Sequence, residues 1–278
     1  MNKWLRTDVK NYNLKDRTLI MGILNVTPDS FSDGGSFTDV EKAVEQAISM
    51  ERDGADIIDI GGESTRPGHE PVSLDEEINR VIPIIRAVKR AVHIPISIDT
   101  YKAETAKQAV KAGASIINDV WGAKKEPEIA RVAADMQAPI VLMHNRDNKD
   151  YVSLIDDMKS DLQESIEIAV RAGVQKSNIV LDPGVGFAKT VEDNLMVMRN
   201  LDQLTELGYP LLLGTSRKSM IGKVLDLPVD QRDEGTGATT CYGITKGVDI
   251  VRVHNVSLNV RMAKMMDAMI GKGDTTIG

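Results

Sequence analysis

The hydrophobic pattern of the chain repeats one unit, in which a short aliphatic run is followed by a polar cluster and then by an amphipathic segment. The aliphatic runs do not alternate strictly with polar residues, which is typical of strands buried on both faces of a parallel sheet. We expect strands at Thr18–Leu24, Ile57–Ile60, Ile94–Ile98, Ser115–Ile117, Ile140–Met143, Ile179–Leu181, Leu211–Leu213 and Ile250–Val253.

The segments between these runs carry apolar residues at helical spacing, as at Val40–Ile48. Thr38 with Glu41, and Ser73 with Glu76, have the spacing of capping boxes, which predicts helices that begin after Thr38 and Ser73. Pro83 predicts a kink in the second of these helices. Further helices are expected over Ala103–Ala112, Pro127–Met136, Leu154–Ala172, Val191–Leu207, Gly237–Lys246 and Ser257–Ile270.

Eight strands that alternate with about eight helices indicate an α/β protein of the (β/α)8 or TIM barrel class. The alternative is an open doubly wound sheet, which predicts a glycine-rich phosphate-binding sequence after the first strand. The chain reads Gly22-Ile23-Leu24-Asn25 there, so the barrel is favoured. No linker rich in proline, glycine or serine divides the chain. We expect one barrel domain over residues 18–278, preceded by an N-terminal extension over residues 1–17 that forms a hairpin under the barrel.

Composition narrows the class of protein. The 278 residues include 34 Lys and Arg against 41 Asp and Glu, and the net charge of −7 argues against a nucleic-acid partner. The first 17 residues hold no apolar segment typical of a secretory signal, and no run approaches the roughly 20 apolar residues of a membrane span. We therefore expect a cytoplasmic protein without a membrane partner. The single cysteine, Cys241, cannot form an internal disulfide.

Polar residues follow the predicted strands, where barrel enzymes carry their active sites. Asp and Asn at such positions also serve as turn or cap residues, but turns do not need Arg252 or Lys218. Arg252 and His254 lie on one side of the last strand, with Val253 opposite, so they can bind an anion together; the alternative is a surface pair. The set comprises Asn25, Asp59, Asp99, Asn118, Asp119, His144, Asp182, Ser216, Arg217, Lys218, Arg252 and His254.

Two connections are longer than the about 2–6 residues of typical loops between a strand and its helix. They cover residues 25–37 and 61–71, and both are polar and rich in glycine. Long loops at the catalytic face predict lids, although a passive surface excursion is the alternative.

Other residues have simpler interpretations. His144 alone makes no metal site, and a structural role is favoured. Lys218 beside Arg217 is compatible with a Schiff-base lysine as in barrel aldolases, but nothing else implies a carbonyl substrate. The methionines at helical spacing fit either core packing or a dimer face. They are Met262, Met265, Met266 and Met269.

Two long stretches, Met21–Gly35 and Asp59–Gly68, resemble signatures of the dihydropteroate synthase family. Five shorter stretches match in order, at Ser97–Tyr101, Ile117–Asp119, Leu181–Phe187, Gly214–Lys218 and Arg252–His254. The resemblance covers nearly the whole chain. It implies an enzyme of folate biosynthesis that joins (7,8-dihydropterin-6-yl)methyl diphosphate to 4-aminobenzoate and releases 7,8-dihydropteroate and diphosphate.

The resemblance also implies residue roles, a Mg²⁺ cofactor, a homodimer and inhibition by 4-aminobenzoate mimics such as sulfonamides. The pterin would be held by Asp99, Asn118, Asp182 and Lys218, with Met143, Phe187 and Gly214 as further substrate-binding residues. The diphosphate would be held by Arg252, His254 and Mg²⁺, with Asn25 as metal ligand. The aminobenzoate site would be shaped by Thr65, Arg66, Pro67 and Ser219. The catalytic candidates are Asp33, Lys218, Arg252 and His254.

These residue types suit the chemistry. A carboxylate such as Asp182 can accept two hydrogen bonds from the donor edge of a pterin. The electron-rich ring can delocalise positive charge, which favours a dissociative path through a pterin cation, and Asp33 can neutralise that cation. One neutral oxygen from Asn25 suits Mg²⁺ that is otherwise held by phosphates and water.

Two other functions stay open at this point. One is a methyltransferase that handles methyltetrahydrofolate, and the other is a catalytically inactive pterin-binding module. Arg252 with His254, Lys218 and the stretch Thr65–Pro67 distinguish the synthase from the methyltransferase, which needs no diphosphate site. Intact candidate residues in every role argue against the inactive module.

Overall fold

Parallel strands form the centre of the molecule in the computed structural model, which describes residues 3–26, 37–63 and 72–273. Eight strands of this described part make one sheet in the order β8-β7-β6-β5-β4-β3-β10-β9, and each is parallel to its neighbours. A parallel bridge between Leu181 and Leu211 joins the two edges, so the sheet closes into the predicted (β/α)8 barrel. The strands are β3 (Leu19–Asn25), β4 (Ile57–Gly61), β5 (Ile96–Asp99), β6 (Ile116–Asp119), β7 (Ile140–Met143), β8 (Ile179–Asp182), β9 (Leu212–Leu213) and β10 (Ile250–Val253).

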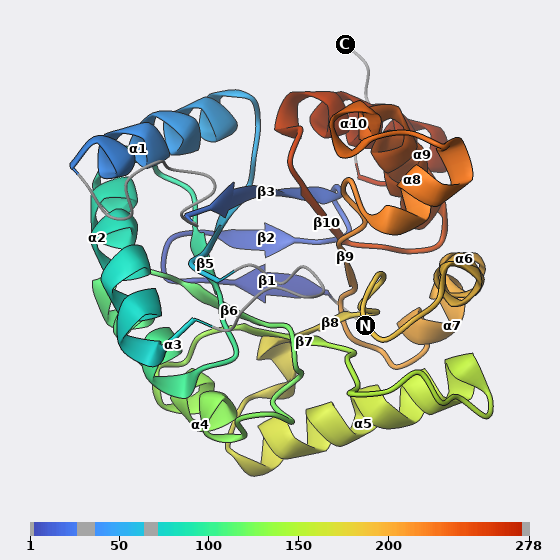
Figure 1. The fold of residues 1–278 in the computed structure, drawn as a ribbon, viewed down its shortest axis with the longest axis horizontal. Coiled ribbons are helices and arrows are strands. Elements are labelled where there is room, and N and C mark those ends of the chain that lie inside the picture. Colours follow the sequence, from blue (N-terminus) through green and yellow to red (C-terminus); the bar gives the residue numbers. More distant parts are fainter. Residues whose placement is uncertain (1–2, 27–36, 64–71, 274–278) are drawn as a thin grey trace.

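Helices follow the strands and form a ring around the barrel (Figure 1). In the described part of the chain they are α1 (Phe37–Arg52), α2 (Leu74–Ala91), α3 (Ala103–Ala112), α4 (Glu128–Asp135), α5 (Leu154–Arg171), α6 (Val191–Arg199), α7 (Leu201–Thr205), α8 (Ser219–Leu225), α9 (Asp233–Thr245) and α10 (Val256–Ile270). Short 3-10 turns cover Lys176–Asn178 and Val229–Gln231. None of these helices is long and apolar enough to cross a membrane.

The single helix expected over Val191–Leu207 is wrong, because the structure divides this segment into α6 and α7. Asn200 separates the two helices, and its side-chain Nδ2 donates to the carbonyl of Met196 at 2.8 Å. Asparagine offers the backbone such local alternatives to helical hydrogen bonds, which the apolar spacing does not reveal.

The expected start of α9 at Gly237 is also wrong, because the helix begins at Asp233. Glycines at positions 235 and 237 disfavour a helix by propensity. In the structure they allow close packing, since a Cβ on Gly235 would lie 2.4 Å from Ile221, and one on Gly237 would lie 2.2 Å from the sulfur of Met262. Tertiary contacts therefore override the local preference.

The two predicted capping boxes have different outcomes. The Oγ of Ser73 accepts a hydrogen bond from the Glu76 amide at 3.3 Å and caps α2 as expected, while the Glu76 carboxylate pairs with Arg80 instead of completing the box. Helix α1 begins at Phe37, so Thr38 lies in its first turn and not at the cap position.

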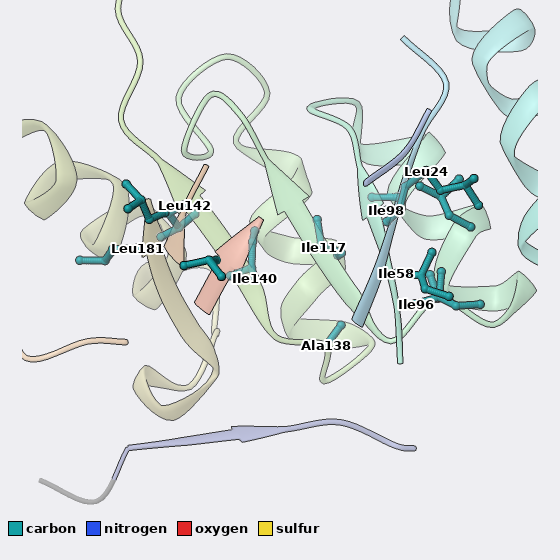
Figure 2. Packing of buried hydrophobic residues seen from close by; sticks show 14 of the residues in the cluster. Leu24, Ile58, Ile96, Ile98, Ile117, Ala138, Ile140, Leu142 and Leu181 are labelled. Carbon is teal, nitrogen blue, oxygen red and sulfur yellow. The ribbon is translucent and has the colours of Figure 1, made fainter. Parts of the chain in front are cut away.

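Side chains within each apolar run alternate between two environments. In β4, for example, Ile58 and Ile60 pack in the core between barrel and helices. Ile96 and Ile98 of β5 belong to the same core, and Figure 2 labels both together with Ile58. The intervening side chains face the barrel interior. At the N-terminal end of the strands these interior residues are apolar too, which is why the sequence shows no alternation there. They are Leu19, Met21, Ile57, Ile116, Val141, Val180, Leu212 and Ile250.

A hairpin closes this apolar end of the barrel. Strands β1 (Trp4–Arg6) and β2 (Asn11–Asn13) pair in antiparallel fashion and cross the barrel end in Figure 1. Leu5, Tyr12 and Leu14 join the interior apolar cluster, and the Tyr12 hydroxyl donates to the carbonyl of Asp56 at 2.8 Å. The N-terminal end is therefore filled, and the other end of the interior is left for chemistry.

Candidate active site

Polar side chains occupy the interior at the C-terminal ends of the strands. Asp59, Asp99, Asn118, Asp182 and Arg252 stand at inward positions, because the residues beside them in each strand pack against the helices. The carboxylates and the amide are buried, although ionisable side chains are rarely buried without a partner. The inward positions of the strands are therefore apolar at the N-terminal end of the barrel, here called the apolar floor, and polar at the C-terminal end.

Arg252 connects this interior polar group. Its Nε donates to Asp59 Oδ2 at 2.6 Å, and its terminal nitrogen donates to Asp99 Oδ2 at 2.8 Å. The amide nitrogen of Asn118 donates to the same Asp59 oxygen at 3.1 Å. The other oxygens, Asp59 Oδ1 and Asp99 Oδ1, are buried without a hydrogen-bond partner among the described residues. Such acceptors favour a ligand that brings N–H donors.

Burial sets the protonation of this group. It raises the pKa of Asp99 to about 7, against the opposing effect of Arg252 and with a further increase from Asp59. Burial alone would lower the pKa of Arg252, but Asp59 and Asp99 outweigh it and raise that pKa. Arg252 therefore stays a cation, while the Asp99 carboxyl can hold or release a proton near neutral pH.

A charged pair lies beside the interior polar group around Arg252. It is formed by Asp182 of β8 and Lys218 from the loop before α8. Burial raises the pKa of Asp182 and lowers the pKa of Lys218 to about 8, and in each case the charge of the other residue opposes the shift. Asp182 Oδ1 accepts the Gly184 amide at 2.7 Å. Lys218 Nζ donates to the carbonyl of Val185 and lies 4.6 Å from the centre of the Phe187 ring.

Further candidate residues lie next to the Arg252 group and the pair of Asp182 and Lys218. A Cβ on Gly214 would lie 3.8 Å from Asp182 Oδ2 and 3.9 Å from the Arg252 Cβ, which puts Gly214 between them. Met143 is buried at the end of β7. Asn25 ends β3 opposite Gly61 of β4.

His254 and Ser219 lie just beyond these strand ends. His254 Nδ1 is 2.9 Å from the Ser216 hydroxyl, whose oxygen also accepts the His254 amide at 3.1 Å. Val253 packs on the helix side, opposite Arg252, as predicted. Ser219 is exposed as the first residue of α8.

Four candidate residues lie outside the described residues and stay predictions. They are Asp33, Thr65, Arg66 and Pro67.

Three polar residues of the predicted set serve the scaffold. The Asp119 carboxylate accepts the backbone amides of Trp121 and Ala123 in a turn. The Arg217 guanidinium pairs with Asp233 of α9 at 2.7 Å. His144 is buried beside Asp161 of α5, which supports the structural role favoured for it.

Two residues with clear contacts to the site were given no binding or catalytic role from the sequence, although Asp59 belongs to the polar set at the strand ends. Asp59 lies within β4, but only the closed barrel reveals that it accepts from both Arg252 and Asn118. Lys189 lies in a loop, where a lysine is ordinarily exposed, and no sequence signal shows that it is buried.

Comparisons with known proteins match this geometry. A family model described as "Pterin binding enzyme" matches residues 21–254. The dihydropteroate synthase of Bacillus subtilis (strain 168) is 61% identical over 269 residues, which are 97% of this chain and 94% of that protein.

Solved structures agree in fold and in sequence. The dihydropteroate synthase of Clostridium difficile, crystallised in the presence of pteroic acid, has a TM-score of 0.91 and 54% identity, over 93% of this chain and 98% of that one. The Xanthomonas albilineans enzyme with 4-aminobenzoic acid has a TM-score of 0.92 and 39% identity, over 97% and 99% of the two chains. This chain belongs to the pterin-binding enzymes, in the family of dihydropteroate synthases.

Proposed function

We propose that the chain is a transferase that condenses (7,8-dihydropterin-6-yl)methyl diphosphate with 4-aminobenzoate, giving 7,8-dihydropteroate and diphosphate. The observation that carries this proposal is that carboxylate oxygens of Asp59 and Asp99 are buried without a hydrogen-bond partner. They lie in the same end of the barrel as Asp182 and Lys218. A flat heterocycle with several N–H donors and one carbonyl complements this set, because buried acceptors such as Asp99 Oδ1 then gain donors.

Pterin recognition follows from the charges. Asp182 accepts from the amino group and the adjacent ring N–H, and Lys218 leaves the Val185 carbonyl to donate to the pterin carbonyl or a ring nitrogen. Asp99 and Asn118 complete the hydrogen bonds of the other ring edge. Met143 and Phe187 supply apolar contact to the ring faces. A ring without these donors is rejected, because the buried polar atoms would stay unpaired.

Residues at and just beyond the C-terminal ends of the strands assist the departure of diphosphate. Arg252 and His254 stabilise the leaving anion, and Asn25 is the protein ligand that we assign to Mg²⁺. No cluster of three or more His, Cys, Asp or Glu side chains suited to a metal occurs in the described ranges. A site with one protein oxygen fits a Mg²⁺ ion held mainly by substrate phosphates and water. When bound, the ion neutralises charge on the diphosphate.

Bond formation then needs no covalent enzyme intermediate. We infer a dissociative path in which the bond between the methylene carbon and the diphosphate oxygen breaks first and Asp33 neutralises the pterin cation. The aminobenzoate nitrogen then forms the new C–N bond and releases one proton to the diphosphate or to water. Thr65, Arg66, Pro67 and Ser219 hold the aminobenzoate, so sulfonamide mimics are expected to compete with it. If added nucleophiles fail to trap a pterin adduct when 4-aminobenzoate is left out, the dissociative path loses its support.

Turnover tests the proposal directly. The purified protein is mixed with the pterin diphosphate, 4-aminobenzoate and Mg²⁺, and diphosphate release is followed. We expect release that depends on 4-aminobenzoate. Methyl transfer from methyltetrahydrofolate would favour the methyltransferase, and pterin binding without any release would favour the inactive module. The cytoplasmic location expected from the sequence stays a prediction, which fractionation of the source cells tests.

We also propose that the chain forms a homodimer through α9 and α10. Met262 packs between these helices, but Met265 and Met269 of α10 are each 60% exposed, and Ile270 of α10 and Tyr242 of α9 are exposed as well. Large exposed apolar patches are typical of interaction sites. Sedimentation velocity should show a dimer that the double variant Met265→Glu, Met269→Lys converts to monomer, while Val152→Glu, at a fully exposed valine elsewhere, leaves it intact. A monomeric wild type would contradict the proposal.

A further inference from the structure

The loop between β8 and α6 carries two residues of the proposed pterin site, Asp182 at its start and Phe187 near its end. Gly184 and Gly186 within it have φ angles of +63° and +90°, a backbone region that favours glycine. Neither glycine has a side chain to pack, so the loop needs other contacts to fix its carbonyl groups. The Phe187 amide donates to the Gly184 carbonyl at 3.0 Å and the Tyr151 hydroxyl donates to the Ala188 carbonyl at 2.9 Å. Two lysine side chains bind loop carbonyls as well.

Lys218 holds the loop from the side of the substrate site, and Lys189 holds it from the other side. Lys218 Nζ donates to the Val185 carbonyl. Lys189 Nζ donates to the carbonyls of Gly184 at 3.1 Å and Phe187 at 3.0 Å. In the proposed reaction Lys218 turns to the pterin, so Lys189 is the lysine that stays on the loop throughout. Burial, and next the charge of Lys218, lower the pKa of Lys189 to about 7, so the ammonium form that makes these contacts is populated at and below about pH 7.

Lys189 is matched to its surroundings. Its side chain is buried, and its third acceptor is His144 Nδ1 at 2.8 Å, so three ammonium protons meet three acceptors. His144 must then carry its own proton on Nε2, which lies 2.9 Å from Asp161 Oδ2. Burial lowers the pKa of His144 to about 4, with Lys189 adding to this shift, so the ring is neutral and can accept.

The loop also packs closely against the residue that follows β7, His144. The His144 amide donates to the Asp182 carbonyl at 2.8 Å, and a Cβ on Gly184 would lie only 1.9 Å from the His144 carbonyl oxygen. Asp161 in turn accepts from Arg146. A chain of contacts therefore runs from α5 through His144 and Lys189 to the loop.

We propose that Lys189 is a positioning residue for pterin binding, which orients Asp182 and Phe187 through the carbonyls of Gly184 and Phe187 and is itself oriented by His144 and Asp161. It does not touch the reacting atoms. The inference rests on the proposed function for the identity of the ligand.

The variant Lys189→Met tests it, with Lys189→Gln as a milder change whose amide can still donate to the loop carbonyls. Lys159→Met removes a lysine that pairs with Glu206 on the surface and serves as the matched control. Binding of 6-hydroxymethylpterin is measured by calorimetry, together with the KM of each substrate and the thermal midpoint. For Lys189→Met we expect at least 10-fold weaker pterin binding and an equal rise in KM for the pterin diphosphate. The KM for 4-aminobenzoate should change less than 3-fold, and Lys189→Gln should lie between.

Equal changes in both KM values, or unchanged pterin affinity in a variant with a lower thermal midpoint, would reduce Lys189 to a merely structural residue and overturn the proposal. The tautomer of His144 can be measured by NMR on wild-type protein with ¹⁵N-labelled histidine. This test depends neither on the folding of a variant nor on turnover. The neutral His144 ring should carry its proton on Nε2 at pH 6, and a proton on Nδ1 would remove the Lys189 contact and the proposal with it. A wild type that neither binds pterin nor turns over contradicts the proposed function instead, while the histidine spectrum still reports the contact.

Discussion

Replacing Asp182 by asparagine gives the sharpest test of the proposed pterin site. The asparagine oxygen can still accept the Gly184 amide, which lies 2.7 Å from Asp182 Oδ1, so the loop keeps this contact. Its NH2 group then faces the pterin donors and cannot accept from them. The variant therefore removes recognition while it preserves shape.

The expected loss follows from two charge-assisted hydrogen bonds, each worth about 1.5–3 kcal/mol. Their sum of about 3–6 kcal/mol corresponds to roughly 10²–10⁴-fold weaker binding, at 1.4 kcal/mol for each factor of ten. Burial raises the pKa of Asp182, so part of this gain already offsets the cost of a buried charge. We therefore expect the lower half of the range, about 10²–10³-fold.

Calorimetric titration of the ligand-free protein with 6-hydroxymethylpterin at pH 7.5 measures this loss. Asp119→Asn is the matched control, because Asp119 is also buried at a strand end but accepts only backbone amides of a turn. That control should lose about 1–3 kcal/mol of stability and keep its pterin affinity. An Asp182→Asn protein that binds pterin within 10-fold of wild type would refute the assignment of this carboxylate.

Three further predictions concern charge and packing. The raised pKa of Asp99, about 7, means that the folded state holds its proton more tightly than the unfolded state; its contribution is present at low pH and is lost as pH rises through that value. Urea titrations should therefore show wild-type stability falling relative to Asp99→Asn between about pH 4 and 7, and parallel curves would contradict this. Arg252→Met leaves Asp59 and Asp99 without their cation and should cost about 3–5 kcal/mol at pH 8, less at pH 5; an unchanged unfolding midpoint would show that the ion pairs contribute nothing. Leu5→Ala opens the buried floor and should cost about 2–5 kcal/mol while both KM values stay within 2-fold, so a selective KM effect would contradict the separation of floor and site.

The predicted strands were nearly complete, and three of them ended one residue too early for the same physical reason. The predictions ended at Leu24, Ile98 and Leu181, whereas the strands extend to Asn25, Asp99 and Asp182. A polar residue ordinarily ends a buried strand in a sequence-based prediction. Here the last inward position faces the polar end of the interior, so the strand continues through it.

The candidate site was predicted in its residue types but not in its pairing. The amino-acid sequence, through its strand-end pattern and its family resemblance, indicated Asp99, Asn118, Asp182, Lys218 and Arg252 as candidates, and they lie together inside the barrel. It could not give the roles of Asp59 or Lys189, since each is defined by partners distant in sequence, such as Arg252 for Asp59, 193 positions away.

The sequence by itself determined the (β/α) repeat, the barrel and the family, because aliphatic runs, helical spacing and long signatures are local properties of the chain. Only the tertiary structure decided which face of each strand looks inward, that α9 tolerates its glycines, and that Lys189 is buried against two carbonyls and a neutral histidine. Strand runs that are apolar on both faces do not reveal their inward side, and burial and charge pairing arise only when the barrel closes. The sequence therefore determines which residue types lie at the C-terminal end of the barrel, and the closed barrel determines their geometry.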